Sequence, residues 1–209
     1  MSLQMADAHA LECCLADGGV AIFPADTVYG LACDPQSPAA VRRLYELKGR
    51  APDKPSAVLF FALEPALAAL PELGARTRAA AAALLPGGLT LLLPNPARRF
   101  ALACGPDPLT LGLRVPALTP ELWVLGAVTQ PLLQSSANVA GGPDARTLAE
   151  VPRALRDGAD LVLDGGELPG TPSTVVDLRG YEESGGWSVV RAGAVGADAL
   201  RSALGAGPH

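Results

Sequence analysis

The sequence predicts an α/β protein built on a mixed sheet, and three features of its 209 residues support this class. Hydrophobic residues make up 49% of the chain, which is enough for a full buried core. Helix-like and strand-like segments alternate at first, whereas strand-like segments crowd towards the end. No internal repeat or break in composition marks a linker. We therefore expect one domain over residues 1–209.

In the first half of the chain, local signals place the ends of each element. An amphipathic pattern predicts a helix that stops at Gly18-Gly19, and Ser37-Pro38 supplies an N-cap followed by proline for a second helix, which Gly49 ends. Short apolar runs between turn residues predict strands. The expected elements are a helix over 3–17, a strand over 20–23, a helix over 37–49, a strand over 57–61, an Ala-rich helix over 75–85 and, after a Pro-Gly-Gly turn, a strand over 89–93.

The second half contains more strand-like than helix-like segments. Apolar runs that contain β-branched residues predict most of its strands, and a last periodic segment predicts a terminal helix. The expected elements are a strand over 110–115, a helix over 119–127, strands over 131–135, 160–164, 173–178 and 187–191, and a helix over 198–204. Because the strands crowd together here, the sheet is expected to be mixed rather than purely parallel.

Composition excludes several classes of function. The four cysteines contain no CxxC spacing, and the two histidines are His9 and His209, so we expect neither a Cys/His zinc site nor a His-dependent triad. Prolines and glycines interrupt the uncharged stretch 79–97, and amides and hydroxyls interrupt 122–143, so we expect no membrane span. The N-terminus lacks a signal-peptide pattern, and we expect a cytoplasmic protein. The net charge of −5 argues against nonspecific nucleic-acid binding over the whole surface but allows a local basic cleft.

Polar residues follow several predicted strands, where open α/β sheets bind ligands. The segment 48–54 places three cations, Lys48, Arg50 and Lys54, within seven residues, and its glycine and proline restrict where they point. Lysine offers a compact charge and arginine a two-pronged donor, so this loop suits a phosphate. Alternatively, Lys48 complements the helix C-terminus and the other two are solvated. The P-loop pattern is absent.

The other polar segments each have a functional and a purely structural interpretation. Arg114 lies in an apolar strand and is expected to face a polar cleft or an anion, or else an exposed strand position. Residues 23–31 place Asp26, Thr27 and Tyr29 after the first strand, as a site or as a capped turn. Residues 133–142 form a strand and a small-residue loop that could coordinate phosphate or a base, and Ser136 is not expected to be a nucleophile because GxSxG is missing.

Taken together, these segments resemble the YrdC-like family of threonylcarbamoyl-AMP synthases over about residues 18–194. KGR followed by SxN is the most specific pair of motifs. The matching pieces, in order, are FPADTVYGLACD, LKGRAPDKPSAV, LLPGGLT, LGLRVP, SSANVAGG, PSTVVD and VVRAGAV. The resemblance implies an open, twisted mixed sheet flanked by helices, with a basic concave cleft. Because the chain ends soon after the last motif, it looks like the short, single-domain form.

The resemblance also implies a reaction. Threonine, bicarbonate and ATP give threonylcarbamoyl-AMP and pyrophosphate, with Mg²⁺ held mainly by the triphosphate. Whether protein groups also hold the metal is left open, and no residue is assigned as a metal ligand. A threonylcarbamoyl transferase complex then modifies certain tRNAs, and direct tRNA binding is expected to be weak. A site rich in cations and poor in histidine suits such chemistry, since the substrate supplies the nucleophile and the protein need only align anions.

Site residues are carried over from the motif matches. The resemblance implies that Arg114 pairs with the threonine carboxylate and that Arg191 closes over the nucleotide, while lysine is not constant in the family at Lys54. The implied catalytic residues are Lys48, Arg50, Ser136 and Asn138. The implied ATP-binding residues are Lys48, Arg50, Lys54, Thr110, Ser136, Asn138, Asp144 and Arg191. The implied threonine-binding residues are Thr27, Arg114 and Ser173.

Some positions depart from the family pattern and keep alternatives open. Ala25 stands where threonine is common, and Leu59 stands where longer, two-domain relatives have a histidine that contacts threonine. Amino-acid selectivity is therefore open at this stage. One alternative is a paralogue of the same fold with carbamoyl-adenylate or unassigned activity. The other is a non-catalytic tRNA- or RNA-binding module, against which the acidic net charge and the few aromatic residues count.

Overall fold

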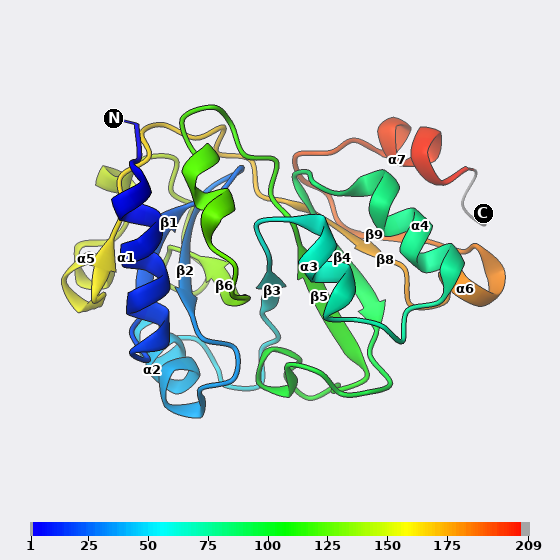
Figure 1. Cartoon of the computed structure of the whole chain (residues 1–209), viewed down its shortest axis with the longest axis horizontal. Helices are drawn as coiled ribbons and strands as arrows, with labels where there is room; N and C mark the ends of the chain where they lie inside the picture. The colour runs from blue at the N-terminus through cyan, green and yellow to red at the C-terminus, as the bar shows by residue number, and fades with distance from the viewer. Residues whose placement is uncertain (1, 206–209) are drawn as a thin grey trace.

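In the computed structural model, which describes residues 2–205, nine strands form one mixed sheet (Figure 1). Their order across the sheet is β7-β1-β2-β6-β3-β5-β4-β8-β9. The strands are β1 (Ala21–Pro24), β2 (Tyr29–Cys33), β3 (Ala57–Leu59), β4 (Leu89–Pro94), β5 (Thr110–Arg114), β6 (Leu132–Ser136), β7 (Leu161–Val162), β8 (Thr174–Asp177) and β9 (Ser188–Arg191). The pairs β1–β7, β3–β5 and β4–β8 are parallel and the others antiparallel. The predicted α/β class with an open mixed sheet is confirmed.

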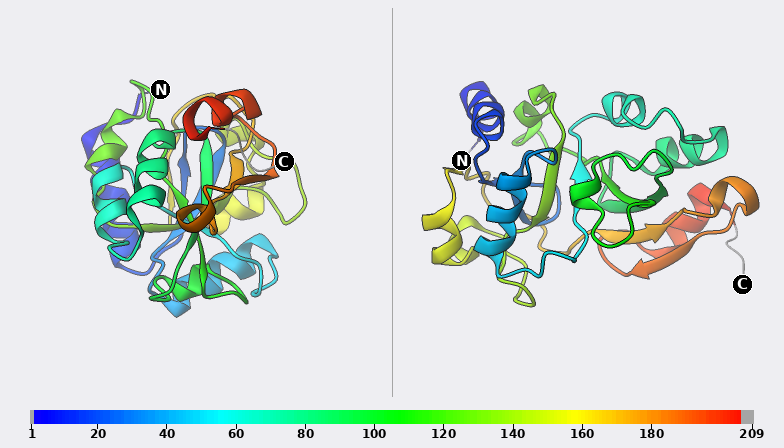
Figure 2. Two further views of the ribbon diagram at one scale, coloured as in Figure 1. Left: turned by 90° about the vertical axis from the view of Figure 1, so that its right-hand side faces the viewer. Right: turned by 90° about the horizontal axis from the view of Figure 1, so that it is seen from below.

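Helices lie on both faces of this sheet (Figure 2). On one face lie α1 (Met5–Ala16), α3 (Leu63–Ala68), α4 (Ala75–Leu84) and the 3₁₀ helix η2 (Trp123–Ala127). On the other face lie α2 (Pro38–Lys48) and α5 (Arg153–Gly158). The remaining helical segments are η1 (Ala101–Ala103), η3 (Leu148–Glu150), α6 (Tyr181–Ser184) and α7 (Ala197–Leu204). No helix within residues 2–205 combines the length and the apolar character needed to cross a membrane.

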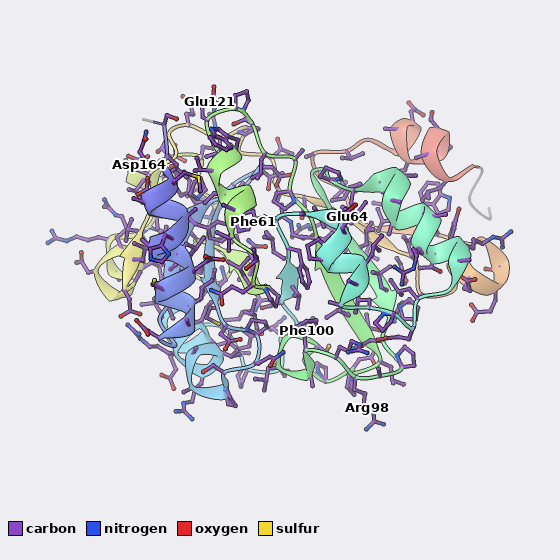
Figure 3. All side chains as sticks on the ribbon, in the orientation of Figure 1. Phe61, Glu64, Arg98, Phe100, Glu121 and Asp164 are labelled. Carbon is purple, nitrogen blue, oxygen red and sulfur yellow. The ribbon has the colours of Figure 1, made fainter. Side chains whose placement is uncertain are left out.

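The two faces of the central strands differ in character. Leu111 and Leu113 of β5 stand opposite Leu93 and Leu91 of β4, and all four are fully buried. Because side chains alternate along a strand, residues 110, 112 and 114 point to the other face. The core continues to Phe61, which packs edge-on against Phe23 with ring centroids 6.0 Å apart, whereas Arg98 projects outward (Figure 3). At β4 and β5, one face of the sheet thus packs into the core, and the other face is available for a site.

Helices whose sequences carry clear local signals form as predicted. The Ser37 side chain accepts a hydrogen bond from the Ala40 N–H, and Gly49 ends α2 in the left-handed conformation with φ 62°. Such a φ is unfavourable for residues with a Cβ and easily adopted by glycine. The helices expected over 3–17, 37–49, 75–85 and 198–204 are all confirmed.

Two local predictions are wrong. The helix expected over 119–127 is only the short 3₁₀ helix η2, because Pro120 and Gly126 leave too little uninterrupted chain for an α-helix. The segment 23–31, interpreted from the sequence as a short polar connection after the first strand, contains the start of β2, which pairs antiparallel with β1. All five residues of β2 are buried, so its apolar run belongs to a central strand and not to a loop. The helices α3, α5 and α6 were not anticipated by the local pattern.

Candidate functional site

A cavity of about 470 Å³ opens on the sheet face opposite the buried leucines. Its volume lies in the range of small-molecule sites. It is lined by residues from most of the polar segments that the sequence singles out. Seven of the predicted site residues line it, namely Arg50, Thr110, Arg114, Ser136, Asp144, Ser173 and Arg191. The other four, Thr27, Lys48, Lys54 and Asn138, do not.

Small side chains keep the floor of this cavity open. Ala57 of β3 stands opposite Gly112 on β5 and opposite Gln134 on β6, and all three line the cavity. Directly opposite residues of neighbouring strands point to the same face. The small methyl group of Ala57 and the absent side chain of Gly112 leave room for a ligand above the sheet.

Arg114 lies at the inner end of the floor and is held by three side chains. Its Nη2 donates to Asp26 Oδ1 at 2.7 Å and to Thr27 Oγ1 at 3.2 Å, and its Nη1 donates to Gln134 Oε1 at 3.1 Å. The ion-paired side chains of Arg114 and Asp26 are 4% and 5% exposed. The predicted polar environment of this strand arginine is therefore real, and Thr27 belongs to it although it does not line the cavity.

Asp26 accepts hydrogen bonds from two residues, one to each carboxylate oxygen. Its Oδ1 faces Arg114, and its Oδ2 accepts from the Ala117 N–H at 3.1 Å. Burial raises the pKa of the Asp26 carboxyl, while the charge of Arg114 and the Ala117 N–H act in the opposite direction. The pair thus depends on both partners, because either charge alone would be buried without compensation.

Lys48, the last residue of α2, lies beneath the loop that follows β6. It is 2% exposed, and its Nζ donates to the main-chain oxygens of Ser136 and Asn138 and to Asn138 Oδ1. Burial, and secondarily the charge of Arg50, lowers the pKa of Lys48 to about 8. With three donated hydrogen bonds, the ammonium group organises the loop from below.

The loop after β6 is further tied together by its own side chains. Ser136 Oγ donates to Asn138 Oδ1 at 2.8 Å, and Asn138 Nδ2 donates to the Gly142 carbonyl at 2.6 Å and to Asp144 Oδ1 at 3.2 Å. Ser136 and Asp144 line the cavity, whereas Asn138 lies behind them. Three of the predicted residues thus form one connected network.

The cationic segment after α2 divides into one residue in the cavity and one outside. Arg50 lines the cavity, its Nη2 donates to the Pro55 carbonyl at 2.6 Å, and its guanidinium lies 5.9 Å from the centre of the Tyr45 ring. Its Nε is buried without a hydrogen-bond acceptor within the described residues. Lys54 is exposed and lies outside the lining.

The opposite wall comes from the segments around β8 and β9. Arg191 Nη2 donates to the Ser173 carbonyl at 2.7 Å and to Ser173 Oγ at 3.2 Å, and Ser173 Oγ lies 2.8 Å from Thr90 Oγ1. Gly193 permits the close crossing of these segments, since a Cβ there would come within 2.3 Å of the Pro172 carbonyl oxygen. Gly193, two residues after Arg191, therefore determines where the Arg191 side chain lies in the cavity wall.

Thr110 lies at the rim and belongs to a charged network. Its Oγ1 donates to Asp107 Oδ2 at 2.6 Å, and Asp107 lies 3.9 Å from Arg179. Arg179 in turn pairs with Asp177 at 2.6 Å. The hydroxyl and Asp107 both line the cavity, so this rim is polar without being uniformly basic.

The sequence did not identify four of the residues that make up the site. Asp26 was noted only as a polar residue of its segment, and Gln134, Thr90 and Asp107 were given no role. Their signal is weak because a single amide, hydroxyl or carboxylate in a strand or loop is ordinary. Residues two apart on a strand point to the same face, so Gln134 lies on the same face of β6 as Ser136. By the same alternation, Thr90 lies on the same face of β4 as Leu92. This rule would have placed both residues on the cavity face.

The arrangement suits an anionic ligand. The charge of Arg114 is balanced by Asp26, but Arg50 and Arg191 form no ion pair with a carboxylate within residues 2–205. The same part of the chain contains no cluster of three or more His, Cys, Asp or Glu residues that could hold a metal ion. Two guanidinium groups in one cavity, with hydroxyls between them, can bind and orient phosphate or carboxylate groups.

Comparisons with known proteins point to one family. The model of the Sua5/YciO/YrdC family, described as "Telomere recombination", matches residues 13–193. The chain is 38% identical over 173 residues to a threonylcarbamoyl-AMP synthase of Chromohalobacter salexigens, covering 80% of this chain and 90% of that protein. It is 36% identical over 177 residues to that of Xanthomonas campestris, covering 83% and 94%. The match to the Pyrococcus abyssi enzyme is 31% over 166 residues, covering 78% of this chain and 48% of that longer protein.

Solved structures extend the similarity to three dimensions. P. abyssi Sua5 complexed with L-threonine superposes with a TM-score of 0.84 at 26% identity, covering 98% of this chain and 59% of that one. Escherichia coli YciO superposes with a TM-score of 0.71 at 22% identity, covering 94% of each chain, which shows the shared fold. The fold of this chain is thus shared with these solved structures.

Proposed function

This chain belongs to the Sua5/YciO/YrdC family, and we propose that it synthesises threonylcarbamoyl-AMP from L-threonine, bicarbonate and ATP. The similarity to synthases that it covers almost end to end supports this reaction. The product serves tRNA modification through a separate threonylcarbamoyl transferase complex, and direct contact with tRNA is weak.

The observation that carries the proposal is the distribution of charge in the cavity. Arg50 and Arg191 come from segments far apart in the chain, line the same cavity and have no carboxylate partner within the described residues. Arg114, charge-balanced by Asp26, lines the same cavity from β5. One cavity therefore offers places for a polyanion and for a carboxylate, which the two organic substrates require.

The chemistry proceeds in two balanced steps. The amine of threonine combines with bicarbonate to give an N-carboxylate and water. A carbamate oxygen then attacks the α-phosphorus of ATP, the bond to the bridging oxygen breaks, and pyrophosphate leaves with that electron pair. The substrate thus supplies the nucleophile, and the protein contributes alignment and charge stabilisation.

The residues divide between the two substrates. Threonine is held by Arg114, Thr27 and Ser173, with Arg114 on its carboxylate, and Arg191 closes over the nucleotide. Arg50 and the loop held by Lys48 act on the phosphates during transfer. The proposed ATP-binding residues are Lys48, Arg50, Lys54, Thr110, Ser136, Asn138, Asp144 and Arg191. Mg²⁺ enters with ATP as part of the substrate, since the triphosphate supplies oxygens that this cation prefers.

The experiment measures pyrophosphate release from MgATP with threonine and bicarbonate each present or omitted. We expect release to require both, and mass spectrometry to detect threonylcarbamoyl-AMP. Equal release without threonine would contradict the proposal and favour a carbamoyl-adenylate activity. Tight, salt-resistant binding of tRNA without any turnover would instead favour a binding module.

A further inference from the structure

Gln134 is a buried polar side chain in the cavity to which no role has yet been given. It is 5% exposed and lines the cavity from β6. Its neighbours in register are Ala32 on β2 and Ala57 on β3. A long amide side chain therefore lies between two methyl groups on the cavity side of the sheet, where an apolar residue of similar size would satisfy packing alone.

Arg114 determines which way the Gln134 amide points. A guanidinium has only donors, so the atom that lies 3.1 Å from Arg114 Nη1 must be the carbonyl oxygen Oε1. The amide nitrogen Nε2 then lies over Gly30, where a Cβ would come within 2.9 Å of it. The glycine thus makes room for the nitrogen end of this amide.

The nitrogen end is a donor without an acceptor. Gln134 Nε2 donates no hydrogen bond to any residue between 2 and 205. On the adjoining side chain, Arg114 Nε is buried without an acceptor in this part of the chain. Leaving a buried donor such as Arg114 Nε unsatisfied is costly, and Gln134 Nε2 is a donor without a protein acceptor on a residue that lines the cavity. The two donors on adjoining side chains indicate that a ligand supplies acceptors here.

We propose that Gln134 is a substrate-binding residue that holds the α-carboxylate of the amino-acid substrate together with Arg114. Gln134 Nε2 donates to a carboxylate oxygen, while Oε1 keeps Arg114 Nη1 in place. Because Oε1 already accepts from Arg114, the amide offers the ligand its N–H donors. Donors only are the complement of a carboxylate. The assignment rests on the proposed function, because it takes the amino acid as the ligand near Arg114.

The neutrality of the amide is part of this assignment. Asp26 already balances the charge of Arg114, so the substrate carboxylate gains less from Arg114 than from an unpaired guanidinium. An amide adds a donor beside it and adds no second anion. A carboxylate at position 134 would still accept from Arg114 but would repel the substrate.

Two variants separate these effects. Gln134→Met has a similar length and removes both the acceptor and the donors. Gln134→Glu keeps an acceptor for Arg114, removes the donors and adds a negative charge. Gln130→Met is the matched control, because the Gln130 amide donates to the Glu12 carbonyl and lies outside the cavity.

The experiment combines kinetics with calorimetric binding of L-threonine and of L-threoninol, in which the carboxylate is reduced to an alcohol. For Gln134→Met we expect threonine affinity to fall about 10- to 100-fold, the usual effect of losing a hydrogen bond to a charged group. Gln134→Glu should lose at least as much, although it preserves the contact with Arg114. The KM for ATP and the affinity for threoninol should stay within about twofold of wild type, as should every value for the control.

The outcomes distinguish this assignment from the proposed function. Unchanged threonine affinity in both variants, or an equal loss for threonine and threoninol, would overturn the role of Gln134 while wild-type turnover still supported the synthase reaction. Wild-type protein that hydrolyses ATP but binds neither compound would overturn both. If Gln134→Met does not fold, Gln134→Glu decides the question, since its acceptor keeps Arg114 anchored.

Discussion

Asp26 and Arg114 form an ion pair at 2.7 Å that joins the turn after β1 to the end of β5, with both side chains almost fully buried. The two residues are 88 positions apart in the chain. Three strands, β2, β6 and β3, lie between β1 and β5 in the sheet. The pair therefore positions Arg114 and also ties together two parts of the fold that share no backbone pairing.

We expect Asp26→Ala to lower the free energy of unfolding by about 3–5 kcal/mol, because it leaves the Arg114 charge buried without compensation. Arg114→Met alone should also destabilise, and the double variant should lose less than the sum of the two. Chemical denaturation of the four proteins checks this coupling. The control, Asp157→Ala, breaks the exposed pair with Arg153 and should cost less than about 0.5 kcal/mol. Additive losses at the buried pair would contradict the prediction.

Arg50→Ala should lower turnover by about 10- to 1,000-fold, the usual effect of removing a donor that stabilises developing charge. Steady-state pyrophosphate release measures this loss. Arg42→Ala is the control, since Arg42 lies on the adjoining helix in an exposed pair with Glu46 and outside the cavity. Wild-type kinetics for Arg50→Ala would remove Arg50 from the site.

Arg114→Ala should raise the KM for threonine far more than the KM for ATP, because only the amino acid places its carboxylate on this guanidinium. Arg191→Ala should show the reverse, with the larger effect on ATP. Initial rates with each substrate varied in turn give both constants. Equal effects of the two variants on both substrates would show that the arginines do not divide the cavity in this way.

The pH dependence of stability should reveal the burial of Lys48. Its pKa is about 8 in the folded protein and 10.5 as a free side chain, so between these values the unfolded chain binds more protons. The free energy of unfolding therefore gains a contribution from Lys48 that grows as pH rises from about 8 to 10.5, and that is lost as pH falls through 8.

The measurement compares wild type with Lys48→Met at several pH values between 7 and about 11. The unfolding free energy of wild type, relative to that of Lys48→Met, should increase by up to about 3 kcal/mol as pH rises across this window. Titration of tyrosines and cysteines is common to both proteins and cancels in the difference. A difference that does not change with pH would mean that Lys48 keeps an ordinary pKa.

Gly193→Ala should weaken ATP binding and destabilise the protein by about 1–3 kcal/mol, since its Cβ would collide with the backbone of Pro172 and Ser173. Moving that crossing displaces Arg191, which donates to Ser173. Gly196→Ala is the matched control, because a Cβ there meets nothing within 4 Å and φ is −75°. Similar melting temperatures and ATP affinities for both variants would show that the close crossing has no role.

The sequence by itself was sufficient where short-range chemistry decides the structure. Ser37 and Gly49 bound α2 through a cap and a left-handed φ, and both effects act within one helical turn. The motif residues Arg50, Arg114 and Arg191 could be assigned to one anion site before any coordinates, because each lies in a motif that resembles the same family. The cavity indeed brings these three together.

Only the tertiary structure decided how these residues are partnered. Lys48 reads in sequence as a free cation at a helix end, yet it is buried under Ser136 and Asn138, about 90 residues further along the chain. Asp26 is the counterion of Arg114, and Gln134 accepts a further hydrogen bond from it. These contacts exist because β1, β6 and β5 belong to the same sheet. The physical reason is that local propensity acts between residues close in sequence, whereas burial and ion pairing depend on contacts that exist only after the sheet has assembled.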